Sequence, residues 1–168
     1  MLVADRGFQR AMKAYAGKAR TNFRGEDAKE PLWDEMKEVL YGPPDPPAIL
    51  SDGSYLFTAC MAHYCIDKGA VVISPKGEII AAAMFTGKPV DAEQMFSPYT
   101  LQLNIFVKNE RAHWPWRKRL DDWANRAAAE WRSLPDTKLY SANIDTRIWL
   151  ISPSTAKLKR LDLSPREY

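Results

Sequence analysis

Four apolar runs in the middle of the chain constrain its fold more than any other feature of the sequence. Each run is of strand length and is rich in residues that favour strands, and together they cover 55–60, 70–74, 78–85 and 101–108. Between the second and third runs, Pro75-Lys76-Gly77-Glu78 predicts a tight turn that joins them as a hairpin. The tail adds shorter candidate strands at 138–143, 147–151 and 158–163. A mostly antiparallel sheet is therefore the expected centre of the fold.

Helical periodicity flanks these strands on both sides. A helix over 5–23 is predicted by the regular recurrence of Phe8, Met12, Tyr15, Ala19 and Phe23. A second apolar stripe follows Pro31, a residue that suits a first helical turn. A third helix over 115–134 is predicted by the stripe Trp116, Leu120, Trp123, Ala127, Trp131 and Leu134. We expect the helices over 5–23 and 115–134 to cover the same face of the sheet, with the tryptophans in the core.

The fold class that follows is α+β, with helices packed on a central sheet. The length of 168 residues matches one domain, so we expect a single domain over 1–168. Its parts are a helical N-terminal third at 5–41, the sheet at 50–108, the helix at 115–134 and terminal strands within 138–163. The proline-rich stretch 42–47 favours an extended, stiff backbone and is interpreted as a spacer.

Several classes of function have no support in the residues. No glycine-rich phosphate loop, Gly-x-Ser-x-Gly elbow or His-Glu-x-x-His pair is present, and two histidines are too few for a His-rich metal site. We therefore predict no enzyme, no cofactor and no metal. A net charge of +3, with both signs mixed along 115–134, argues against nucleic acid as a partner. His113, just before that helix, is interpreted as a surface or capping residue.

The two cysteines of the chain stand close together in Cys60-Met61-Ala62-His63-Tyr64-Cys65, between two apolar runs. Redox pairs and zinc knuckles use a shorter spacing, and a zinc site would need further ligands. A disulfide that closes a small loop and a pair of buried free thiols at strand ends are both compatible with this pattern. A cysteine nucleophile assisted by His63 would lack a third group nearby to orient the histidine.

The stretch from Asp52 to Cys65 resembles the signature of the Ivy family, the inhibitors of vertebrate lysozyme. In that family an acidic-Gly-x-x-Tyr strand runs into a Cys-Lys-Pro-His-Asp-Cys loop, followed by a strand and a hairpin. The segments 69–74 and 79–85 are similar to that hairpin. Upstream, Phe8 and Met12 resemble the pattern of the family's first helix, and Pro31 with Trp33 resembles its Pro-x-Trp. The resemblance covers about residues 5–107, and the 115–134 helix with the tail does not match the family.

The resemblance implies a disulfide between Cys60 and Cys65 and a protein that occludes the active-site cleft of a lysozyme or other muramidase. In the family the loop enters the cleft and its histidine meets the two catalytic carboxylates, which assigns the central contact to His63. Beside it, Met61, Ala62 and Tyr64 replace the family's Lys, Pro and Asp, which indicates a divergent member. Alternatives are an immunity protein against a peptidoglycan-degrading toxin and an Ivy-like interaction domain with no muramidase target.

The expected compartment depends on the cysteines. The N-terminus lacks the apolar segment of a secretory signal. A bridged pair predicts a periplasmic mature protein whose signal has been removed, whereas free thiols predict a cytoplasmic one. The sequence contains no apolar run of about 18 residues, so we do not expect the chain to insert into a membrane. The sequence leaves open which hydrolase is the target and whether the chain forms a homodimer.

Overall fold

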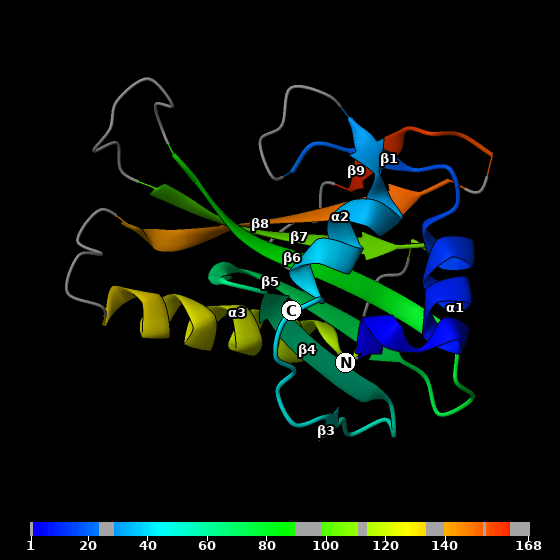
Figure 1. Ribbon diagram of the computed structural model, residues 1–168, viewed down its shortest axis with the longest axis horizontal. Helices are drawn as coiled ribbons and strands as arrows, with labels where there is room; N and C mark the ends of the chain where they lie inside the picture. Colours follow the sequence, from blue (N-terminus) through cyan, green and yellow to red (C-terminus); the bar gives the residue numbers. More distant parts are fainter. Residues whose placement is uncertain are drawn as a thin grey trace.

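The computed structural model describes residues 2–23, 29–89, 99–110, 114–133, 140–152 and 154–161. Within these ranges, seven strands form one sheet in the order β3-β4-β5-β6-β7-β8-β9, and two short strands pair separately (Figure 1). The sheet consists of β3 Ala48–Ile49, β4 Tyr55–Met61, β5 Tyr64–Ile73, β6 Ile79–Pro89, β7 Tyr99–Val107, β8 Tyr140–Ile151 and β9 Leu158–Leu161. The separate pair is β1 Arg20–Thr21 and β2 Glu30–Pro31. The predicted α+β class is confirmed.

The sheet is antiparallel except at one pairing, where β8 runs parallel to β7. Parallel neighbours need a crossover connection, and the helix α3, Arg117–Arg132, lies between these two strands in the chain. The candidate strands at 138–143 and 147–151 belong to one strand, β8, of which 138 and 139 lie outside the described residues. The helix predicted over 115–134 is α3, and its last position, 134, also lies outside them, as does His113.

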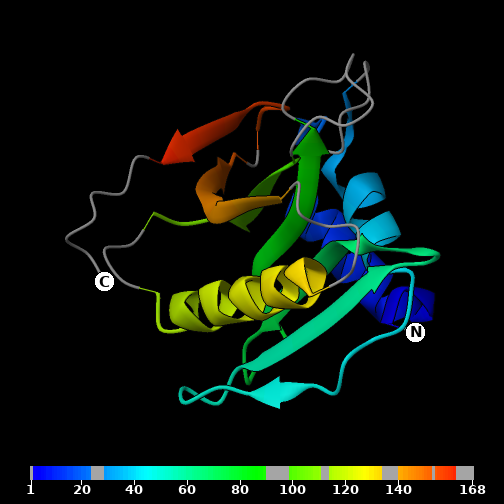
Figure 2. The same cartoon turned by 90° about the vertical axis from the view of Figure 1, so that its left-hand side faces the viewer.

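Helices cover both faces of the sheet, so the prediction that the first and last helices share one face is wrong. The helices α1, Arg6–Ala16, and α2, Leu32–Val39, pack on one face, and α3 packs on the other (Figure 2). The reason is visible in β5, where Ala70 and Val72 belong to the core under α3 while Val71 belongs to the core under α1 and α2. A sheet that is apolar on both faces has to be covered on both.

The first helix is shorter than its apolar spacing predicts. Asp5 caps its start, because the side-chain Oδ1 accepts a hydrogen bond from the Phe8 N–H at 2.7 Å. Gly17 ends it in a left-handed conformation with φ of 59°, and the Gly17 N–H donates to the Lys13 carbonyl. Phe23 follows the helix and still packs in the core, with ring centroids 5.6 Å from Phe106 and 5.2 Å from Trp149.

The proline-rich stretch 42–47 lies against the sheet instead of spacing two bodies apart. The Gly42 N–H donates to the Cys60 carbonyl at 2.7 Å, and the Asp45 N–H donates to the Thr58 carbonyl at 3.0 Å. Pro44, between them, is paired with Ala59 in an isolated antiparallel bridge. Prolines lack the N–H that a further strand would need, so they suit the edge of a sheet. The stretch therefore extends the edge begun by β3 along the whole of β4.

Tryptophans contribute to the α3 side of the core, as the sequence predicts for Trp123. Its indole is 5% exposed and meets Phe85 edge to face, with 6.2 Å between the ring centroids. Trp114 and Trp116 are buried as well, whereas Trp131 is only half-buried. None of the helices in the described ranges is long and apolar enough to cross a membrane.

Candidate functional site

The loop that carries the resemblance is a tight hairpin turn between β4 and β5. Met61 pairs with Tyr64 across the two strands, so Ala62 and His63 alone form the turn. His63 has a φ of 62° and is the only residue other than glycine with a positive φ in the described part of the chain. Glycine adopts this left-handed conformation without strain, whereas other residues do so rarely, with histidine among the better tolerated. An imidazole therefore occupies a turn position that the backbone alone would give to glycine.

A disulfide between Cys60 and Cys65 closes this turn at its base, as the resemblance implies. The Cα atoms of the two residues are 4.8 Å apart. The register changes between the pair Cys60–Lys68 and the pair Met61–Tyr64, so three residues of β5 bulge where β4 advances by one. Cys65 lies in that bulge. We call residues 60–65, with their disulfide, the clamped hairpin.

The clamped hairpin is exposed at its tip and at Cys65, and it is buried at Cys60. His63 is exposed, Met61 and Ala62 are half-buried, and Cys60 is 8% exposed. The side chain of Tyr64 lies outside the described part of the structure. The turn stands at the end of β4, where the chain that leaves α2 also passes (Figure 2). The side chain that is assigned the central contact is therefore presented to solvent.

The end of α2 and the residues that follow it pack closely on β4 and β5 at two glycines. A Cβ on Gly42 would lie 2.3 Å from the Cys60 carbonyl oxygen and 3.0 Å from the Ala62 nitrogen. A Cβ on Gly69 would lie 2.7 Å from the Leu40 side chain. A side chain at position 42 would meet backbone atoms, so the backbone would have to move, whereas one at position 69 would have to displace the side chains of Leu40 and Val39. The chain after α2 therefore meets the hairpin backbone to backbone at Gly42, and the side chains of Val39 and Leu40 lie against the backbone of Gly69.

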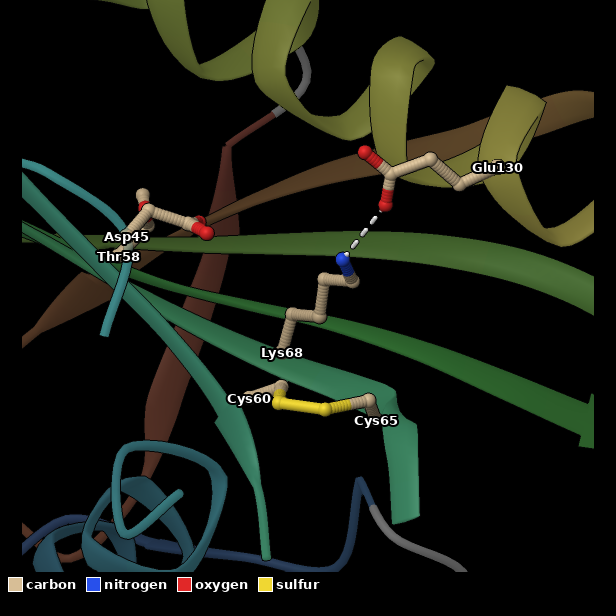
Figure 3. Close-up of a disulfide and its surroundings, with 6 residues drawn as sticks. All are labelled: Asp45, Thr58, Cys60, Cys65, Lys68 and Glu130. Atoms are coloured by element: carbon tan, nitrogen blue, oxygen red, sulfur yellow. Dashed lines mark hydrogen bonds and ion pairs between the residues drawn. A yellow bond between two sulfur atoms is a disulfide. The ribbon is translucent and has the colours of Figure 1, made fainter. Parts of the chain in front are cut away.

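Polar contacts brace the hairpin base on the α3 face of the sheet. The Lys68 Nζ lies 3.0 Å from Glu130 Oε2 of α3, and Figure 3 shows this side chain rising from β5 beside the disulfide. The Thr58 hydroxyl donates to Asp45 of the edge stretch at 2.6 Å. An ion pair with one exposed partner stabilises by at most about 1 kcal/mol, so this contact orients Lys68 more than it stabilises the fold.

Titratable groups elsewhere have shifts with structural causes. Burial raises the pKa of Tyr15 far above its ordinary range, and its hydroxyl donates to the Phe106 carbonyl at 2.8 Å. On α3, burial raises the pKa of Asp121 although the Arg117 guanidinium pairs with it at 2.9 Å. No cluster of His, Cys, Asp or Glu in the described ranges could hold a metal ion.

Sequence reasoning identified the hairpin but missed what holds it. Gly42 stands in the stretch interpreted as a spacer, and Gly69, which lies within β5, directly precedes the run predicted over 70–74. Neither gives a signal in the sequence that it contacts the loop or α2. Tyr41, which lies beside the hairpin, was also missed. The signal that could have pointed to Tyr41 is its place in the sequence, an aromatic residue between the end of the second apolar stripe and the proline-rich stretch.

Comparisons of this chain with models of protein families, with curated proteins and with solved structures find no match. The resemblance to the Ivy family therefore rests on the residues quoted above.

Proposed function

We propose that this protein inhibits a lysozyme or other muramidase by inserting the clamped hairpin into the active-site cleft. The observation that carries the proposal is His63, an exposed non-glycine residue in a left-handed turn. Backbone strain of this kind costs about 1–3 kcal/mol and collects at functional sites. We infer that a histidine stands there in place of glycine because its imidazole is used.

The chemistry of a muramidase site suits an imidazole. Glycoside hydrolases of this class use two carboxyl groups, one held protonated and one ionised, about 5–9.5 Å apart. A neutral imidazole has one nitrogen that accepts and one that donates a hydrogen bond, and the protonated form donates from both. His63 could therefore satisfy both carboxyl groups while presenting no glycosidic bond to cleave. The disulfide fixes the loop in advance, which lowers the entropy lost on binding.

The residues beside His63 indicate the class of target. Where the Ivy family has a cation, a proline and an anion, this loop has Met61, Ala62 and Tyr64. A cleft that receives these residues has to be less charged at its mouth than one that receives the family's loop. We infer that the target is a bacterial or phage-type muramidase and not hen-type lysozyme. A protein with this target acts in immunity against a peptidoglycan-degrading toxin or in defence against a phage enzyme.

The disulfide is compatible with an oxidising compartment, because cytosolic thiols are kept reduced. We propose that the protein acts in the periplasm, where peptidoglycan and the enzymes that cleave it meet.

The test is a cell-wall lysis assay with hen-type lysozyme, a phage-type lysozyme and a bacterial muramidase, each titrated with the oxidised protein. We expect stoichiometric inhibition of the phage-type or bacterial enzyme. His63→Ala should weaken binding by about thirtyfold or more, because truncation of a central contact costs about 2 kcal/mol. Lys108→Ala is the control, because its amine donates to the Ala14 carbonyl, away from the hairpin.

Two results would overturn the proposal. One is the absence of inhibition with all three enzymes, in the presence of the intact disulfide. The other is an affinity for the inhibited hydrolase, measured by calorimetry, that is the same for His63→Ala and the wild type. Binding would then use another surface.

A further inference from the structure

A groove lies between the end of α2 and the clamped hairpin. It has a volume of about 380 Å³ and is lined by Lys37, Glu38, Tyr41, Met61 and Ala62. Met61 and Ala62 belong to the hairpin itself, and the other three belong to the last turn of α2 and the residues that follow it. One wall of the groove is therefore the side of the proposed inhibitory loop.

Tyr41 is an unusual member of this lining. Among the described residues, the large hydrophobic side chains that are clearly exposed are Tyr41 at 49%, Ile49 at 71% and Tyr55 at 41%. Ile49 and Tyr55 pair with each other at the other end of β4. Tyr55 and Met61 are the two ends of that strand, which puts them about 20 Å apart at about 3.3 Å per residue. Of these three exposed side chains, Tyr41 is the one beside the hairpin.

The backbone around Tyr41 is fixed. The Tyr41 N–H donates to the Glu38 carbonyl at 3.2 Å, and the next residue, Gly42, donates to the Cys60 carbonyl at 2.7 Å. Tyr41 is thereby held between α2 and the hairpin base. A tyrosine on a fixed backbone loses little entropy when a partner covers it, and tyrosine is enriched among the residues that dominate interfaces.

We propose that this groove is the second contact of the inhibitory interface, filled by an uncharged apolar or aromatic side chain from the rim of the hydrolase cleft that receives His63. The proposal rests on the proposed function. A cleft that encloses His63 has to cover Met61 and Ala62 too, and these two residues wall the groove. Lys37 and Glu38 give the rim one charge of each sign, so a charged occupant would lose its hydration without a net gain.

The experiment uses the hydrolase of the three above that the wild-type protein inhibits, with affinities measured by calorimetry. Tyr41→Ala should weaken binding at least tenfold, and Tyr41→Phe, which keeps the ring, should stay within about threefold of wild type. Tyr55→Ala is the matched control, because it removes a similarly exposed tyrosine from the far end of β4; its affinity should not change. Thermal unfolding of each variant checks that the fold is kept.

The outcomes separate this proposal from the one on which it rests. If His63→Ala loses affinity while Tyr41→Ala does not, the hairpin binds alone and the groove proposal is overturned. Equal losses for Tyr41→Ala and Tyr55→Ala would also overturn it, since the groove would have no special part. Sedimentation of the protein alone tests another occupant: a dimer that Tyr41→Ala dissociates would assign the groove to a second copy of the chain. If none of the three enzymes is inhibited, both proposals fail.

Discussion

At the scale of single residues, the conformation of His63 separates its contribution to stability from its contribution to binding. A left-handed conformation costs a residue with a Cβ about 1–2 kcal/mol, and glycine escapes this cost while losing more entropy on folding. We therefore expect His63→Gly to unfold in urea within about 1 kcal/mol of wild type, on the stable side, while it loses inhibition as His63→Ala does.

His63→Val supplies the contrasting variant, because a β-branched residue is poorly tolerated at a φ of 62°. It should be less stable than His63→Gly by more than 1 kcal/mol. A marked loss of stability in His63→Gly would mean that the imidazole packs against the fold, and the residue would then be structural. The φ value itself could not be foreseen, since the sequence shows a loop of unknown turn type.

At the scale of elements, the clamped hairpin combines a two-residue turn, a bulge in β5 and a disulfide. The disulfide closes a short ring, so the chain-entropy estimate gives it only about 2 kcal/mol of stability. We expect the double variant Cys60→Ser, Cys65→Ser to keep the circular dichroism of the native sheet and to lose most of its inhibition. Unfolding of the whole sheet in this variant would contradict the view that the disulfide shapes the loop alone.

The positions of the strands were more predictable from the sequence than the packing of the helices on the sheet. β4, β6 and β7 follow apolar runs that the sequence displays directly. The turn at Ser74–Glu78 forms where Pro75 and Gly77 predict it, with the Ser74 N–H donating to the Glu78 carbonyl. The face that each helix covers was not predictable, because β5 carries Val71 toward one face and Val72 toward the other with similar hydrophobicity. The spacing of apolar residues along a helix shows which side of the helix is buried, but it does not show which face of the sheet the helix covers.

The candidate site was predictable only in part, for a related reason. Cys60, His63 and Cys65 lie within six consecutive residues, so their loop was recognisable from the sequence. The contacts of Gly42 with Cys60 and of Gly69 with Leu40 join residues from different elements. Such contacts depend on register and on the path of the chain after α2, and a local pattern contains neither.

At the scale of the whole molecule, one sheet separates two apolar cores. The core under α1 and α2 supports the clamped hairpin through Ala59, Leu40 and Val39, whereas the core under α3 contains most of the tryptophans that are buried. Val39 and Leu40 of this first core lie against Gly69 of β5, four residues after Cys65. Damage to the second core should therefore lower stability before it changes the shape of the binding loop.

Trp123→Ala tests that separation. The indole is 5% exposed and meets Phe85 of β6, so its removal should cost about 3–5 kcal/mol of unfolding free energy in urea. Trp131→Ala, about two helical turns further along α3, is the matched control. It should lower the free energy of unfolding clearly less, because that side chain is only half-buried. Below the temperature at which Trp123→Ala unfolds, its affinity for the inhibited hydrolase should stay within about threefold of wild type. A larger loss of affinity in the folded variant would show that α3 fixes the geometry of the hairpin, through Lys68 and Glu130, as strongly as α2 does.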